Sequence, residues 1–225
     1  MDTMILAAGR GERLRPLTDG TPKPLIKVGA RRLIEYHLDA LAAAGMNQIV
    51  INLAHLGEQI VQQLGDGSRY DVSIAYSPEP EGALETAGGI MNALELIKSE
   101  YFCVVNGDIW TDFDFSKLPA NISGDVHLIL VDNPEQHPEG DFHLDATGHL
   151  SLKTQSRLTF SGIAVYRKQF FSQTESGKMP LLPLFEKAIR AHRATGERYC
   201  GQWFDAGTPE SLQTLREFVH KFQAT

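Results

Sequence analysis

Short apolar runs alternate with amphipathic stretches through the first half of the chain, and this alternation constrains the fold more than any other feature. The runs have the length of buried strands, and the stretches between them place apolar residues at helical spacing. Buried strands separated by helices predict an α/β fold with a mostly parallel central sheet and helices on both faces. The expected strands are residues 3–9, 48–54, 71–77 and 101–108, and the expected helices are residues 31–45, 57–65 and 86–97, the last capped by Thr86.

The second half of the chain is richer in strand-like segments, and helices follow near its end. Thr208 and Pro209 have the order typical of a helix N-cap followed by proline at the first helical position. No stretch rich in proline, glycine and serine separates the two halves, so we predict a single domain over residues 1–225. The expected strands here are residues 126–131, 141–145, 149–152 and 158–166, and the expected helices are residues 181–193 and 208–221.

The distribution of charge indicates a small anionic ligand. The 225 residues include 28 acidic and 21 basic side chains, so the chain carries a formal charge of −7, which is unfavourable for general nucleic-acid binding. Seven basic and two acidic residues lie between Gly9 and Arg32, so this stretch carries +5 and the remainder carries −12. A local basic region on an acidic protein favours a small anion over a polyanion.

The cysteines and the apolar segments indicate a cytoplasmic protein without a membrane partner. Cys103 and Cys200 are far apart and lack metal-ligand spacing, so we expect both to be reduced. No window approaches the roughly 18 consecutive apolar residues that a membrane-spanning helix needs. The apolar run Met4–Ala8 is too short for the core of a signal peptide. We expect a monomer or a small homo-oligomer.

A pair of glycines follows the first expected strand. Gly9 and Gly11 allow a tight turn and can bring backbone N–H groups against phosphate oxygens. Leu14 stands where a dinucleotide-binding fingerprint has its third glycine, which argues against an NAD-dependent oxidoreductase, and a Walker motif is absent. The glycines alone are therefore compatible with a simple turn or with a phosphate-binding turn.

Basic residues after this turn favour phosphate binding. Arg13 and Arg15 lie within four residues of Gly11, and a guanidinium group can bind phosphate through two parallel hydrogen bonds. Lys23 lies between Pro22 and Pro24, which restrict the backbone and would fix the direction of the ammonium group. The alternative for Lys23 is a solvated lysine in a rigid surface loop.

Two carboxylates are expected near the sheet edge. Asp108, in "NGD" (106–108), ends the most apolar strand, where a carboxylate can hold Mg²⁺, although Asn-Gly-Asp is also common in turns. Asp205 precedes the helix that begins near Thr208, where the helix dipole alone would favour it. If the two face each other, they form a two-carboxylate Mg²⁺ site. The small residues of "LETAGG" (84–89) would permit close approach of a flat base, or tight helix packing.

Taken together, these segments resemble one family. "LAAGRGERLRPLTDGTPKPLIKVG" (6–29), with "LETAGG", "NGD" and "FDAGT", resembles the signature of the sugar-1-phosphate nucleotidyltransferases, and the likeness covers essentially the whole chain. The resemblance implies a Rossmann-like nucleotidyltransferase fold with a nucleotide-binding half (1–110) and a sugar-phosphate-binding half (111–225). The compact length and the segments "NGDIWTD", "EGDF" and "TFSGI" are most similar to bacterial members that use N-acetylmuramate 1-phosphate.

The resemblance also implies roles for individual residues. Residues 10–13 would wrap the triphosphate, and Asp108 and Asp205 would bind Mg²⁺. Gly140 and Asp141, in "EGDF", would contact the acceptor sugar. The implied catalytic residues are Arg13, Lys23, Asp108 and Asp205, and the implied nucleotide-binding residues are Gly9, Gly11, Glu12, Arg13, Lys23, Leu84, Glu85 and Asn106.

The implied reaction is Mg²⁺-dependent transfer from UTP to N-acetylmuramate 1-phosphate, giving UDP-N-acetylmuramate and pyrophosphate in peptidoglycan recycling. The alternatives are another sugar- or choline-phosphate nucleotidyltransferase, with glucose 1-phosphate or mannose 1-phosphate as acceptor, and a non-catalytic nucleotide-binding regulatory subunit. The chain lacks the Tyr-Gly-Val-Val and Glu-Lys-Pro motifs of the thymidylyltransferases, which argues against a glucose acceptor. The presence of all four implied catalytic residues argues for an enzyme.

Overall fold

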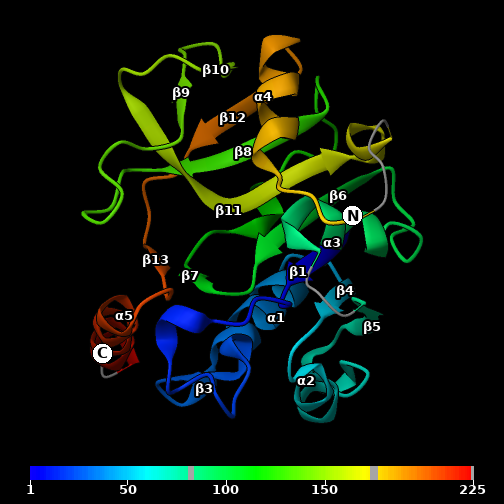
Figure 1. Ribbon diagram of the computed structural model, residues 1–225, viewed down its shortest axis with the longest axis vertical. Helices are drawn as coiled ribbons and strands as arrows, with labels where there is room; N and C mark the ends of the chain where they lie inside the picture. Colours follow the sequence, from blue (N-terminus) through cyan, green and yellow to red (C-terminus); the bar gives the residue numbers. More distant parts are fainter. Residues whose placement is uncertain (81–83, 173–176, 224–225) are drawn as a thin grey trace.

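The structure, a computed structural model, describes residues 1–80, 84–172 and 177–223 and is organised around one mixed sheet (Figure 1). The first half of the chain contributes four parallel strands in the order β5-β4-β1-β6. The apolar runs of β1, β4 and β6 form strands because both of their faces are covered, whereas β5 lies at the edge of the sheet and has one buried residue among its six. Their bounds are β1 Asp2–Leu6, β4 Gln48–Leu53, β5 Ser73–Pro78 and β6 Tyr101–Asn106.

The second half of the chain extends this sheet beyond β6. The long strand β11 (Arg157–Arg167) runs antiparallel between β6 and β8 (Val126–Val131), and β12 (Ala194–Arg198) follows parallel to β8. An irregularity between Phe160 and Ile163 changes the register of β11, whose first residues pair instead with β9. The short strands β9 (Phe142–Leu144) and β10 (Leu150–Ser151) complete a described sheet of nine strands.

Helices cover both faces of the sheet, and the side chains of each strand alternate between them. On β1, Ile5 packs with α1 (Leu33–Ala43) and α2 (Gly57–Leu64), whereas Met4 packs with α3 (Glu85–Ala93) and α4 (Leu182–Arg190). This two-residue alternation is the one expected of a strand buried on both sides. Among the described residues, no helix is both long and apolar enough to span a membrane.

The C-terminal helix α5 (Pro209–Gln223) lies beside the sheet and closes a third apolar cluster (Figure 1). Leu212, Leu215 and Val219 of α5 pack with Leu14 and Trp110. Two short ribbons lie next to this cluster. They pair β2 (Lys27–Val28) with β3 (Arg31–Arg32), and β7 (Ile109–Thr111) with β13 (Trp203–Asp205). The remaining elements are the 3₁₀ turns Glu12–Leu14, Lys23–Leu25, Ser68–Tyr70, Phe115–Lys117 and Lys168–Phe171.

The predicted fold class and most predicted elements are confirmed, and one predicted helix is corrected. Thr208 caps α5 as predicted, because its Oγ1 accepts the Ser211 N–H at 3.2 Å. Thr86 does not cap α3, which already begins at Glu85 and ends at Ala93. The carbonyl of Met179 accepts the N–H groups of Ala87 and Gly88, at 3.0 and 3.2 Å, so backbone from another segment fulfils the role expected of the Thr86 side chain.

Candidate active site

The site lies where the connections of the sheet change direction. From β1 the chain continues to β4 on one side, and it later returns to β6 on the other side. Leu6 at the end of β1 lies opposite Asn106 at the end of β6. The glycine turn and the Asn-Gly-Asp segment therefore emerge side by side, at the type of position where open α/β sheets bind ligands.

The two glycines of the turn have different functions in the structure. Gly11 has a left-handed φ of +65°, and a Cβ there would lie 2.8 Å from Cγ2 of Thr18. The hydroxyl of Thr18 donates a hydrogen bond to the Gly11 carbonyl at 2.8 Å. Gly9 lines a cavity, and a Cβ there would meet no atom within 4 Å. Gly11 is thus required for the turn, and Gly9 leaves space for a ligand.

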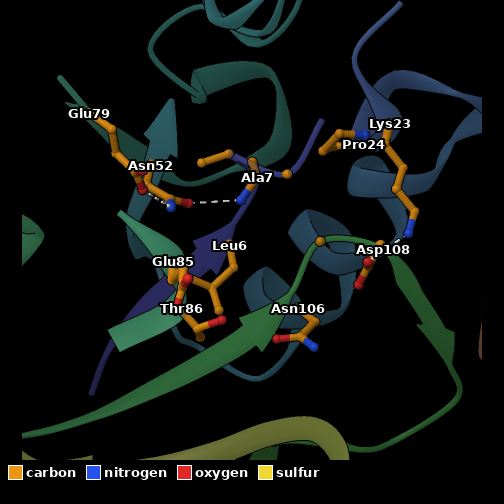
Figure 2. Close-up of a pocket in the computed structure, with 13 residues that line it drawn as sticks. Leu6, Ala7, Lys23, Pro24, Asn52, Glu79, Glu85, Thr86, Asn106 and Asp108 are labelled. Atoms are coloured by element: carbon orange, nitrogen blue, oxygen red, sulfur yellow. Dashed lines mark hydrogen bonds and ion pairs between the residues drawn. The ribbon is translucent and has the colours of Figure 1, made fainter. Parts of the chain in front are cut away.

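Lys23 lies inside the site. It begins the 3₁₀ turn Lys23–Leu25 directly after Pro22, and only 6% of it is exposed. Its Nζ lies 2.6 Å from Oδ2 of Asp108 (Figure 2). The prolines therefore direct the ammonium group toward the end of β6, and the surface alternative is excluded.

Asp205 is brought to Asp108 by the small ribbon of β7 and β13. Asp205 lies opposite Ile109 in this ribbon, and the Ala206 N–H donates to the Asp108 carbonyl at 2.9 Å. A Cβ placed on Gly207 would lie 2.8 Å from Nη2 of Arg13 and 2.9 Å from both carboxylate oxygens of Asp205. The structure therefore gathers all four predicted catalytic residues, Arg13, Lys23, Asp108 and Asp205, around one point.

The electrostatics of the two carboxylates fit a cation. Burial and the nearby negative charge of Asp108 raise the pKa of Asp205, whereas Lys23, Arg13 and the Gly207 N–H act in the opposite direction. A divalent cation would relieve the repulsion between the carboxylates. In the described part of the chain, no group of three or more His, Cys, Asp and Glu side chains has a metal-binding arrangement. Two carboxylates suit Mg²⁺, which usually keeps waters and binds substrate phosphates as well.

A buried histidine supports the segment that carries Asp108. His37 of α1 is 2% exposed, and burial lowers its pKa to about 4, although a hydrogen bond to the Ile109 backbone and the charge of Asp108 act to raise it. The imidazole is therefore neutral at pH 7. His37 lies beneath the start of β7 and contributes an apolar ring with one polar contact to this part of the core.

One cavity, of about 230 Å³, opens beside the glycine turn. Three polar residues that line it, Asn52, Glu79 and Thr86, were not among the predicted site residues, although Thr86 stands in the "LETAGG" segment. The buried Asn52 accepts the Ala7 N–H at 2.7 Å and donates to Glu79 at 2.7 Å (Figure 2). The signal for Asn52 was a polar residue within the apolar run of 48–54. The predicted residues that line this cavity are Gly9, Lys23, Glu85, Asn106 and Asp108.

A second cavity, of about 390 Å³, meets the first at Asn106 and Asp108, which line both. Trp203 forms part of its wall, and its Nε1–H donates to the Ser161 carbonyl at 2.8 Å, so β13 is tied to β11. The other residues of the wall are Arg13, Ile109, Pro134, Gln136, His137, Thr159, Phe160, Ser161 and Asp205. Arg13 therefore lines the second cavity. The two cavities form one site, and they meet at a junction where Asn106 and Asp108 line both.

The other predicted site residues lie outside both cavities. Asp141 binds two residues that line the second cavity: Oδ1 lies 3.1 Å from Nε2 of His137, and Oδ2 accepts the Phe160 N–H at 2.8 Å. The remaining four, one of which is the turn residue Gly11, do not line either cavity. Gly140 packs against Asn133, Glu12 is exposed, and the Leu84 N–H donates to Glu79.

A family model described as "Nucleotidyl transferase" matches residues 2–142, which is more than half of the chain. The chain belongs to this nucleotidyl transferase family. It is 50% identical to the N-acetylmuramate alpha-1-phosphate uridylyltransferase of Neisseria meningitidis over 92% of this chain and 94% of the relative. It is 31% identical to the protein of the same name from Caulobacter vibrioides, over 92% of each chain.

Solved structures bear out the nucleotidyltransferase fold. A Bacillus anthracis protein crystallised with a sucrose superposes with a TM-score of 0.86 at 23% identity, covering 97% of this chain and 95% of the other. The family predicted from the glycine turn, the Pro-Lys-Pro segment and the two aspartate motifs is thereby confirmed.

Proposed function

We propose that this nucleotidyltransferase joins UTP and N-acetylmuramate 1-phosphate to give UDP-N-acetylmuramate and pyrophosphate. The observation that carries the proposal is the junction of two cavities at Asn106 and Asp108, with the Lys23 ammonium group beside it. The names of the two relatives that match over more than nine-tenths of their length support the uridylyl group and the acceptor. An acceptor derived from cell-wall sugar would place the enzyme in peptidoglycan recycling, in the cytoplasm.

In the proposed reaction, an oxygen of the acceptor phosphate attacks the α-phosphorus of UTP. The bond from this phosphorus to the bridging oxygen breaks, and pyrophosphate leaves with the electron pair. The attacking phosphate is already an anion, so no general base is needed. The main barrier is the approach of two anions, and fixed positive charge together with positioning lowers it.

The roles of the chain's own residues follow from their places. The first cavity, beside the glycine turn, receives the nucleotide, and the second receives the acceptor. Lys23, buried at the junction, would stabilise the α-phosphate during attack, and Arg13, at the catalytic end of the second cavity, would offset negative charge on the reacting phosphates. Asp108 and Asp205 would hold Mg²⁺, which when bound neutralises charge on the phosphates.

A pyrophosphate-release assay tests this proposal. The enzyme would be given UTP with N-acetylmuramate 1-phosphate, N-acetylglucosamine 1-phosphate or glucose 1-phosphate, and the first acceptor would be repeated with GTP and dTTP. We expect the highest kcat/KM with UTP and N-acetylmuramate 1-phosphate, and loss of activity in EDTA that Mg²⁺ restores. Preference for another acceptor or nucleotide would refute the assignment within the family. Full activity in EDTA would refute the metal role.

A further inference from the structure

The proposed acceptor carries a chemical group that the catalytic residues do not address. N-acetylmuramate differs from N-acetylglucosamine by a lactyl ether on the sugar ring, and this ether ends in a carboxylate. The acceptor therefore brings a second negative charge, separate from its phosphate. A protein group that favours this carboxylate would discriminate between the two sugars.

The wall of the second cavity offers one group for this purpose. Arg13 lies beside Asp205 and Gly207 at the catalytic end, where the phosphates react. The remaining wall comes from Pro134, Gln136, His137 and residues 159–161, together with Ile109 and Trp203. Within that remaining wall, His137 alone has a side chain that can carry a positive charge.

Asp141 fixes the orientation of the His137 ring. One oxygen of Asp141 lies 3.1 Å from Nε2 of His137, and the other accepts the Phe160 N–H at 2.8 Å. This carboxylate therefore links the histidine to β11. The ring makes no other hydrogen bond with a described residue, so its Nδ1 is available to a ligand. The side chain is 43% exposed.

The backbone around His137 is also braced. Its N–H donates to the Pro134 carbonyl at 2.9 Å. Asn133 donates to the carbonyls of Pro138 and Arg157, at 2.9 and 3.0 Å, which ties the segment to the start of β11. Gly140, with a φ of +60°, has no room for a side chain because a Cβ would lie 2.6 Å from Oδ1 of Asn133. These contacts fix the backbone of the loop that carries His137.

We propose that His137, oriented by Asp141, recognises the lactyl carboxylate of the acceptor and so sets its selectivity. The inference rests on the proposed function and names the residue that recognises the acceptor. With both ring nitrogens protonated, Nε2–H donates to Asp141 and Nδ1–H donates to the substrate carboxylate. Asp141 is then a positioning residue. The contact with the acceptor that the family motif implies for Asp141 is made indirectly, through His137.

The test measures selectivity, defined as kcat/KM for N-acetylmuramate 1-phosphate divided by kcat/KM for N-acetylglucosamine 1-phosphate, with UTP. We expect His137→Ala to lower this ratio about 10- to 100-fold, the range for a hydrogen bond to a charged group. His137→Lys should recover part of the ratio because it restores a positive charge. Asp141→Asn should lower it less, since an amide oxygen can still accept the Phe160 N–H.

Gln136→Ala is the matched control, because Gln136 lines the same cavity from the neighbouring position without charge. We expect this variant to change the ratio less than threefold. An equal loss of kcat/KM for both acceptors in His137→Ala, with an unchanged ratio, would overturn the inference. If the unmodified enzyme does not favour N-acetylmuramate 1-phosphate, the proposed function itself fails, so the two failures are distinguishable.

Discussion

Replacing Gly11 by alanine tests how the glycine turn is built. The left-handed φ of +65° costs an alanine about 1–2 kcal/mol. Its Cβ would also lie 2.8 Å from Cγ2 of Thr18 and 3.3 Å from Cβ of Lys23, and crowding of this kind costs about 1–3 kcal/mol. The unfolded chain loses freedom through the same substitution, which offsets about 0.4–1 kcal/mol. We expect a net loss of about 1–5 kcal/mol in the free energy of unfolding.

A second substitution separates strain from crowding. Thr18→Ser removes the crowded methyl group but keeps the hydroxyl that donates to the Gly11 carbonyl. Alone it should cost about 1 kcal/mol, because the methyl group is buried. In the double variant the new alanine methyl occupies the vacated space, so the two losses should not add. The remaining cost is that of the left-handed backbone.

Urea unfolding and thermal melts of the two single variants and the double variant measure this coupling. Gly11→Ala should lower Tm by roughly 2–20 °C for a chain of this size. Gly9→Ala is the matched control: it meets no atom within 4 Å, so it should hardly affect stability, but it narrows the first cavity and should raise the KM for UTP. An unchanged Tm in Gly11→Ala, or additive losses in the double variant, would refute this account of the turn.

Three further expectations concern the junction and its support. Asp108→Asn should abolish Mg²⁺-dependent pyrophosphate release while the circular dichroism spectrum stays unchanged, and near-normal turnover would disprove the metal role. Lys23→Ala should lower kcat/KM about 10²-fold or more, as expected on removal of one charge stabiliser, and a loss below tenfold would contradict its assignment. Burial lowers the pKa of His37 to about 4, so the unfolded chain alone gains this proton as pH falls from 6.5 toward 4. His37 should therefore cost the native state up to about 3 kcal/mol across that window. The free energy of unfolding, measured with urea at pH 7 and pH 5, should change less with pH in His37→Gln than in the unmodified protein. Equal changes in the two proteins would contradict this.

Local patterns in the sequence were sufficient for the elements that are buried over several residues. The run 126–131 predicts β8 at the bounds that the structure has, because six successive residues carry the signal of a covered strand. The ribbon of β7 and β13 was not predicted. Each of its strands has three residues, too few for a period to appear. Yet this ribbon joins Asp205 to Asp108, so the pairing of the two carboxylates depended on a long-range contact that local pattern does not encode.

The roles of polar residues were predicted where those residues stand in a sequence motif. They were missed where the role depends on how the fold buries or orients the side chain. Arg13, Lys23 and Asp108 stand in recognisable segments, and the structure brings them together. Asn52 and His137 stand in no motif. Asn52 has its function because the sheet buries it against the Ala7 N–H, and His137 acquires an orientation only through Asp141 and the loop that precedes it.

The apolar cluster under α5 explains how charged groups from distant parts of the chain keep a fixed geometry. Leu14 directly follows Arg13, Trp110 lies two residues after Asp108, and Ala206 directly follows Asp205, and all three are buried against one another and α5. Each charged group is therefore anchored by an apolar neighbour in the same cluster, and rigid support of this kind sets the precision of a site. The carboxylates repel each other, so apolar burial beside them, together with the positive charges of Lys23 and Arg13, supplies the free energy that holds them together before any cation binds.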